Sequence, residues 1–105
     1  MKIAISSTGK NLNSNVDSVF GRCPYFIIAE IKNKKIIKVE TLKNTSVSKL
    51  SGAGISAAQL VVDKDVNAVV SGNIGPRALE VLKQFKIKTY KDKGSVKHVL
   101  QKFLK

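Results

Sequence analysis

The stretch from Val66 to Arg77 constrains the fold most, because a short strand there leads straight into a turn and a helix. Residues 66–70 are largely apolar and predict a buried strand. Two glycines and Pro76 follow at once, and apolar residues then recur at helical spacing from residue 78 to 85. Proline is favoured at the first helical position, because its missing N–H would be unpaired there. Since backbone N–H groups at such a helix start form a ready anion site, the sequence predicts a place that holds a negative group.

Apolar periodicity along the rest of the chain predicts four further strands and two further helices. The expected strands span 2–6, 25–31, 35–40, 66–70 and 87–90, and the expected helices span 53–64, 76–85 and 96–104 with Ser95 as N-cap. Strands before the first helix favour an antiparallel meander, and the alternating elements after it favour parallel units with right-handed crossovers. We therefore expect one α/β domain over residues 1–105, with three helices and a five-stranded mixed sheet in the order 3-2-1-4-5, strand 2 antiparallel.

This strand order predicts a crevice at the carboxyl ends of the first and fourth strands. The chain would leave these two neighbouring parallel strands in opposite directions, and ligands bind at such points in open α/β sheets. The turn after the first strand carries Ser7, and the turn after the fourth carries Asn73 and Gly75. We expect these three residues to line the crevice and to contact a ligand.

The formal net charge of +12 raises the question of a nucleic-acid partner. From Lys83 onward the chain has eight lysines against one acidic residue, Asp92, and such a surface attracts polyanions. The features of base recognition are missing, since the chain has no tryptophan and its only arginines are Arg22 and Arg77. The composition therefore favours a solvated basic face over a nucleic-acid site, with a phosphate-ligand or nucleic-acid binding module as the alternative.

Cysteine usage and hydropathy indicate a cytoplasmic protein. The single cysteine, Cys23, excludes an internal disulfide and suits a reducing compartment. No apolar run approaches the roughly 20 residues that a membrane span needs. Lys2 is followed by the strand-like segment 3–5, which is unlike a signal peptide. We expect no membrane association.

Three motifs carry a family resemblance: Asp-Ser-Val-Phe-Gly-Arg-Cys-Pro-Tyr-Phe at 17–26, Ser-Gly-Ala-Gly-Ile-Ser-Ala-Ala-Gln at 51–59, and Gly-Asn-Ile-Gly-Pro at 72–76. Together with the element order, they resemble the dinitrogenase iron–molybdenum cofactor family, the small domain of NifX-type accessory proteins and of the C-terminus of NifB-type proteins. The resemblance spans nearly the whole chain. It implies a ribonuclease-H-like α/β fold and a protein that binds or carries an anionic metal–sulfur cluster, such as the iron–molybdenum cofactor or a precursor. It also implies a partner protein in cofactor assembly.

The resemblance implies roles for individual residues toward such a cluster. The backbone amides of Gly52, Gly54 and Gly75 would donate hydrogen bonds to it, and Arg22 would supply positive charge. Tight turns and close helix–sheet packing are the alternative reason for the glycines. The alternative role of Arg22 is to fix its loop through backbone carbonyls or Asp17.

Cys23 is the one soft ligand that the chain offers to a thiophilic metal, although a cysteine next to a proline is more typical of a small buried apolar residue. Many family members carry histidines where this chain has Val19 and the segment 49–51. Its only histidine, His98, falls off the apolar stripe of the last helix and is expected at the surface. One chain therefore has no complete metal-ligand set, and we expect a cluster to be held chiefly through its charge and sulfides, by a monomer or a weak homodimer.

Residues for catalysis are missing from the sequence, so we expect no enzyme. The seven acidic residues are scattered, whereas a two-metal nuclease needs several converging carboxylates. The chain has no Gly-x-Ser-x-Gly motif, and Ser7-Thr8-Gly9-Lys10 lacks the other positions of a phosphate loop. The leading hypothesis is a non-enzymatic binding or carrier protein, and a module that regulates a partner without a ligand of its own is a further alternative.

Overall fold

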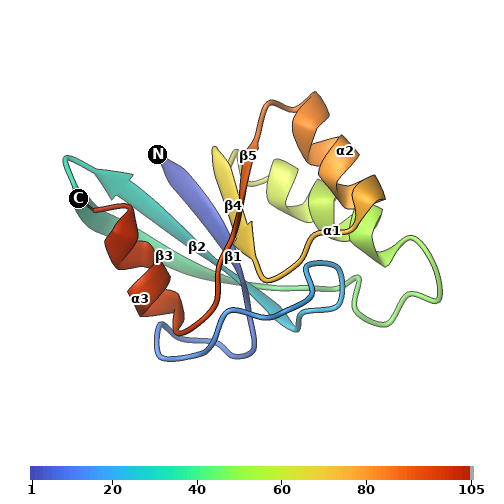
Figure 1. The fold of residues 1–105 in the computed structure, drawn as a ribbon, viewed down its shortest axis with the longest axis horizontal. Helices are drawn as coiled ribbons and strands as arrows, with labels where there is room; N and C mark the ends of the chain where they lie inside the picture. The colour runs from blue at the N-terminus through green and yellow to red at the C-terminus, as the bar shows by residue number, and fades with distance from the viewer. Residues whose placement is uncertain (105) are drawn as a thin grey trace.

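Five strands form one mixed sheet in the order β3-β2-β1-β4-β5 in the computed structural model, which describes residues 1–104 (Figure 1). The elements in chain order are β1 (Lys2–Ser7), β2 (Tyr25–Lys32), β3 (Lys35–Lys43), α1 (Ala53–Val62), β4 (Ala68–Ser71), α2 (Pro76–Gln84), β5 (Lys88–Lys91) and α3 (Val96–Lys102). β2 runs antiparallel to β1 and β3, and β1, β4 and β5 are parallel. The predicted element order, strand order and strand directions are confirmed.

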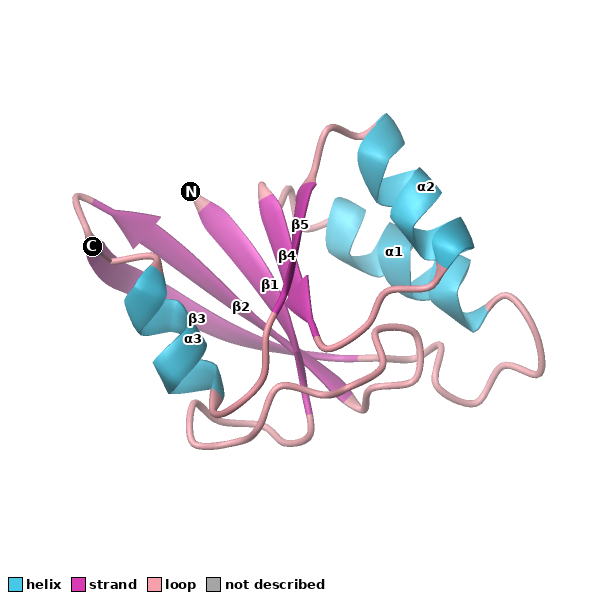
Figure 2. Ribbon diagram, viewed as in Figure 1, coloured by secondary structure: helices cyan, strands magenta, loops and turns pink. Residues whose placement is uncertain are grey.

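The helices cover both faces of the sheet, α1 and α2 on one side and α3 on the other (Figure 2). Successive strand residues point to opposite faces. On the central strand β1, Ala4 therefore packs with α1 and α2, whereas Ile3 and Ile5 pack with α3. Alanines at positions 57, 58 and 78 allow α1 and α2 to approach the sheet and each other closely. The centre of the sheet is thus buried on both faces. The helices pack on these faces and not over the carboxyl ends of the strands.

Element boundaries differ from the predictions by at most three residues, each for a local reason. α1 ends at Val62 instead of 64, because the chain turns into a left-handed conformation at Asp65 (φ 58°). β3 continues to Lys43, since its pairing with β2 runs on to Tyr25. The turn between β2 and β3 has positive φ at Asn33 and Lys34, the geometry of a two-residue hairpin. Among residues 1–104, no helix has the length and apolar character needed to cross a bilayer.

Candidate functional site

The carboxyl edge of the sheet is organised by two buried serines at the ends of β1 and β4. The Ser6 hydroxyl lies 2.8 Å from the Ser71 hydroxyl and 3.0 Å from the Asp17 carbonyl oxygen. The Asp17 N–H in turn donates to the Ser6 carbonyl, and the Gly72 N–H donates to the Asp17 carbonyl. These bonds hold the loop that follows β1 across the ends of both parallel strands.

Gly72 is required by this close approach. A Cβ atom at Gly72 would lie 2.6 Å from the Cα atom of Ser18, which is a clash with backbone. Beyond it, the Phe20 N–H donates to the Asn73 carbonyl at 3.0 Å. The turn after β4 is therefore fixed at its Gly72 end by the loop packed against it.

The starts of α1 and α2 lie side by side and form a cavity of about 250 Å³, here called the helix-start hollow. A Cβ at Gly54 would lie 3.4 Å from the Ala78 Cβ, an ordinary contact distance, so the two helix starts meet here without requiring glycine at position 54. The lining comes from the first residues of both helices and their N-caps: Gly52, Ala53, Gly54, Ile55, Gly75, Pro76, Arg77 and Ala78. The structure thus brings Gly52, Gly54 and Gly75 to one place.

No side chain caps either helix start. The N-cap residues are Gly52 and Gly75, and neither helix has a side-chain hydrogen bond to its first amides or an acidic residue in its first turn. The first N–H groups of a helix have no partner within the helix, and the helix dipole places partial positive charge there. Two such ends side by side favour an anion in the hollow.

The two N-cap glycines have different reasons to be glycine. Gly52 has φ 73°, a left-handed conformation that glycine adopts without strain. Gly75 has φ −64° and ψ 159°, which any residue adopts, and nothing lies within 4 Å of a Cβ built on it. The fold therefore does not require glycine at 75, and the absent side chain keeps the α2 amides uncovered.

The two arginines have different surroundings: Arg22 bonds to a loop, and Arg77 lines the helix-start hollow. The Arg22 guanidinium donates to the carbonyls of Val47 and Lys49, so it fixes the loop before α1, the alternative role considered from the sequence. Arg77 lines the helix-start hollow, and no bond of its side chain is found within residues 1–104. We did not assign Arg77 a role from the sequence, although its place directly after Pro76 in the third motif was a signal.

Two other candidate residues lie elsewhere. Ser7 is fully buried, and its hydroxyl donates to the Gly9 carbonyl and accepts from the Gly9 N–H, so it closes its own turn rather than facing a ligand. Asn73 is exposed but lines a different hollow, formed at the strand ends. The predicted common crevice is therefore corrected: Ser7 does not contribute a contact to it.

Cys23 is not placed as a metal ligand. Its side chain is 0% exposed, and its thiol donates to the Phe20 carbonyl at 3.2 Å. Burial, aided by the negative charge of Asp17, raises the pKa of the Cys23 thiol to about 12, so the thiolate that metals bind is disfavoured. His98 is exposed on α3, as expected. Within residues 1–104 no three His, Cys, Asp or Glu side chains gather to hold a metal ion.

We expect Cys23 to resist thiol reagents while the protein is folded. With a pKa of about 12, only about one thiol in ten thousand is ionised at pH 8, and burial blocks access as well. Ellman's reagent added to native protein at pH 8 should therefore react at least about a thousand times more slowly than with protein unfolded in guanidinium chloride. Prompt stoichiometric reaction of the native protein would show that the thiol is accessible.

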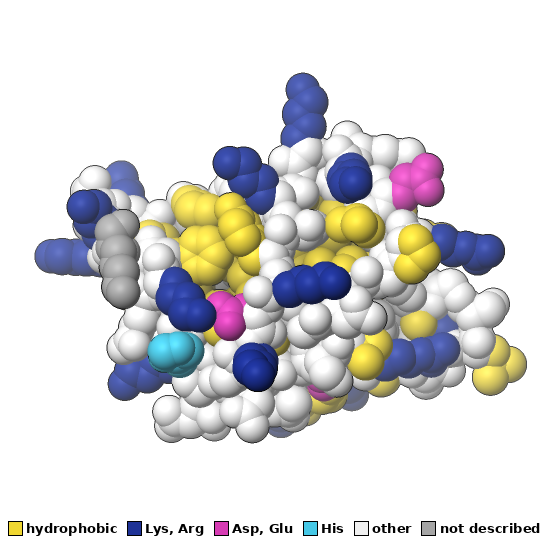
Figure 3. Space-filling model, in the orientation of Figure 1, with side chains coloured by type: hydrophobic (Ala, Val, Ile, Leu, Met, Phe, Trp, Pro, Cys, Tyr) yellow, Lys and Arg dark blue, Asp and Glu magenta, His cyan; other side chains and the backbone are white. Residues whose placement is uncertain are grey.

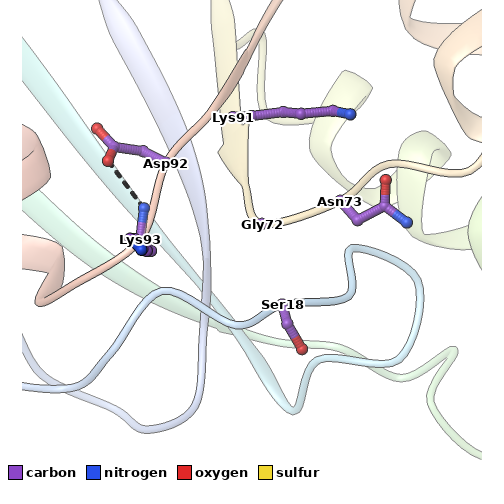
Figure 4. A pocket seen from close by; sticks show the side chains of 6 residues that line it. All are labelled: Ser18, Gly72, Asn73, Lys91, Asp92 and Lys93. Carbon is purple, nitrogen blue, oxygen red and sulfur yellow. Dashed lines mark hydrogen bonds between the residues drawn. The ribbon is translucent and has the colours of Figure 1, made fainter.

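A second and larger cavity, of about 570 Å³, lies on the other side of the turn after β4 and is here called the strand-end hollow (Figure 4). Its lining follows three parallel strands: Ser18 after β1, Gly72 and Asn73 after β4, and Lys91, Asp92 and Lys93 at the end of β5. The sequence did not single out Lys91 and Lys93, whose only signal was the general abundance of lysine toward the C-terminus. They reach this edge because Lys91 pairs with Ser71 in the sheet.

Fold and site together define a class of protein: a small α/β domain with a basic carboxyl edge and two uncapped helix starts, and without a gathered set of metal ligands in residues 1–104. The chain belongs to the dinitrogenase iron–molybdenum cofactor family, which its sequence matches over residues 1–105.

Similarity to individual proteins agrees with this membership. An uncharacterised protein of Methanocaldococcus jannaschii is 40% identical over 91 residues, which are 87% of this chain and 74% of the relative. The apo form of the orange protein from Desulfovibrio gigas superposes with a TM-score of 0.90 at 31% identity, over 98% of this chain and 86% of that one. A Thermotoga protein assigned as NifB superposes with a TM-score of 0.81 at 34% identity, over 97% of this chain and 85% of that one.

Proposed function

We propose that the protein is a non-enzymatic carrier that binds an anionic metal–sulfur cluster, or a precursor of one, in the helix-start hollow. The observation that carries this proposal is the pair of uncapped helix starts, α1 and α2, that meet at Gly52 and Gly75. Membership of the dinitrogenase iron–molybdenum cofactor family supports the kind of anion. The orange protein structure is of the apo form, and the existence of an apo form implies that this relative also has a ligand-bound form.

The chemistry of the hollow suits the outer surface of such a cluster. Its sulfides carry negative charge and accept hydrogen bonds, and the amides of α1 and α2 are donors that point toward them. Favourable interaction with a helix start contributes about 0.3–1 kcal/mol at an exposed site, and the Arg77 side chain at the rim adds a positive charge. With Cys23 buried, no bond from the protein's thiol to the metal is needed in this arrangement.

Weak, purely non-covalent binding also suits a carrier. The hollow is an open surface feature lined by exposed residues such as Gly75, Pro76 and Arg77, so cargo enters and leaves without rearrangement of the core. The residence time of a ligand held by a few hydrogen bonds and charges is short compared with one held by metal–thiolate bonds. Rapid exchange with a partner in cofactor assembly would follow.

The test is retention of a defined thiometallate. Apo-protein would be mixed anaerobically with tetrathiomolybdate and ferrous or cuprous ion, desalted, and analysed for molybdenum, for the second metal and for charge-transfer absorbance. We expect co-elution of metal at a fixed ratio to protein. The double variant K86A/K88A, which removes two exposed lysines remote from the hollow, should retain as much.

Two results would contradict the proposal. Absence of co-eluting metal and of charge-transfer absorbance would favour a module that acts on a partner without a ligand. The second is a clear loss of retained metal in K86A/K88A relative to the unaltered protein. That loss would mean that net charge, rather than the helix-start hollow, attracts the thiometallate.

A further inference from the structure

We propose that the strand-end hollow is a second anion site, which binds the phosphate group of a small phosphorylated molecule. Its volume of about 570 Å³ lies within the range of about 300–1,000 Å³ that is usual for small-molecule sites, so it has room for more than the phosphate itself. The hollow lies at the carboxyl ends of β4 and β5, the edge at which open α/β sheets bind ligands, and the loop that carries Ser18 separates it from the end of β1.

The donors of this hollow are free to bind an anion. In Figure 4 the Lys91 side chain extends alongside the Gly72–Asn73 segment, and the Asn73 amide reaches out from the same segment. Within residues 1–104 the two salt bridges join Lys64 to Glu40 and Lys102 to Asp92, so neither Lys91 nor Lys93 has a carboxylate partner. Figure 4 shows Lys91 on the Asn73 side of the hollow and Lys93 at its other end beside Asp92, so an anion between them would be attracted by a positive charge from each end.

The acidic residue of the hollow does not oppose an anion. The Asp92 carboxylate points away from Lys91 and Asn73 in Figure 4, toward α3, where it accepts a hydrogen bond from Lys102 at 2.9 Å. It also accepts from the Lys93 N–H at 2.8 Å. These two bonds turn the Asp92 carboxylate away from Lys91 and Asn73, so the part of the rim formed by those two residues stays positive.

Charge favours phosphate over carboxylate in this hollow. Lysine interacts with an anion as a point charge, and a phosphate monoester carries about 1.5–2 negative charges at pH 7 against one for a single carboxylate. A long polyanion is not favoured, because lysines and arginines are spread over this whole face rather than gathered into a continuous stripe (Figure 3). The geometry therefore fits one local phosphate group.

This site is separate from the helix-start hollow. Asn73 lines one cavity and Gly75 lines the other, with the chain between them as a partition. The strand-end hollow uses side-chain ammonium groups and no helix start, so a substitution at Lys91 or Lys93 leaves the α1 and α2 amides in place. The two proposals can consequently fail independently.

The experiment is an NMR titration of ¹⁵N-labelled protein with inorganic phosphate at constant ionic strength. We expect saturable shifts of the amide signals of residues 72, 73 and 91–93. The variant K91A/K93A should weaken phosphate binding at least about tenfold, because it removes both positively charged donors of the hollow. The charge-matched control K86A/K88A should bind phosphate like the unaltered protein.

Three outcomes would overturn the proposal. The first is no saturable shift at residues 72, 73 and 91–93. The second is an equal loss of affinity in K86A/K88A, which would leave only generic charge attraction. The third is acetate binding as tightly as phosphate in the same titration, which would remove the preference for phosphate. Thiometallate retention by K91A/K93A, measured in parallel, reports on the helix-start hollow alone.

Discussion

The substitution Gly75→Asp is expected to abolish thiometallate retention while leaving the fold intact. Nothing lies within 4 Å of a Cβ at position 75, and φ −64° with ψ 159° suits an N-cap residue with a side chain. The new carboxylate would accept hydrogen bonds from the first amides of α2 and place a negative charge in the helix-start hollow. Like charges in contact cost several kcal/mol, so affinity should fall at least about a hundredfold.

Stability should move in the opposite direction to binding in this variant. Aspartate is a better N-cap than glycine by a few tenths of a kcal/mol, and its charge interacts favourably with the helix dipole by about 0.3–1 kcal/mol. Urea unfolding followed by circular dichroism should therefore show a free energy of unfolding equal to or above that of the unaltered protein. A loss of retention that came with unfolding would not count as support for the site.

The variant Gly75→Asn is the matched control, since it has nearly the same shape without the charge. It should cap the same amides and so weaken thiometallate retention, but by less than Gly75→Asp. Full retention in both variants would refute binding at the helix-start hollow. Equal loss in both would assign the effect to the amides alone rather than to charge.

The second large effect is expected at Gly72, three residues away. Gly72→Ser should lower the free energy of unfolding by about 1–3 kcal/mol, because a Cβ there would lie 2.6 Å from the Ser18 Cα and 3.1 Å from its carbonyl oxygen. Relief of the clash would separate the loop after β1 from the end of β4. For a domain of this size, 1 kcal/mol corresponds to about 4–8 °C in Tm.

Gly75→Ser is the control that separates sterics from glycine content. The same substitution in the same turn meets no atom at position 75 and introduces a good N-cap, so its Tm should stay the same or rise. Both variants would be measured by thermal unfolding under identical conditions. Equal destabilisation of the two would contradict the close approach of Ser18 to Gly72.

The fold could be predicted because its signals are local. The apolar run before Ser71, the Gly-Pro turn at 75–76 and the Asn33 hairpin each specify an element over a few residues, and their order leaves few sheet arrangements. The family resemblance grouped Gly52, Gly54 and Gly75 around one ligand, and the structure places them together because α1 and α2 lie on one face of the sheet and begin at the same edge.

Side-chain direction in irregular segments could not be predicted in this way. Cys23 and Arg22 are neighbours, yet the thiol points into the core and the guanidinium points to the carbonyls of the loop before α1. Without a strand or helix period, sequence position does not determine which of the two is buried. Lys91 and Lys93 were missed for another reason, since their nearness to Asn73 depends on the register of β5 against β4.

The enclosure of Cys23 bears on what happens to a sulfur-rich passenger. It is the chain's single cysteine, and its thiol is protonated and out of contact with solvent. Exchange of sulfur between a thiometallate and a protein requires an accessible thiolate on the protein. A thiometallate at the surface of this folded domain would therefore meet no reactive protein thiol, and no metal–thiolate bond or mixed disulfide with Cys23 would form.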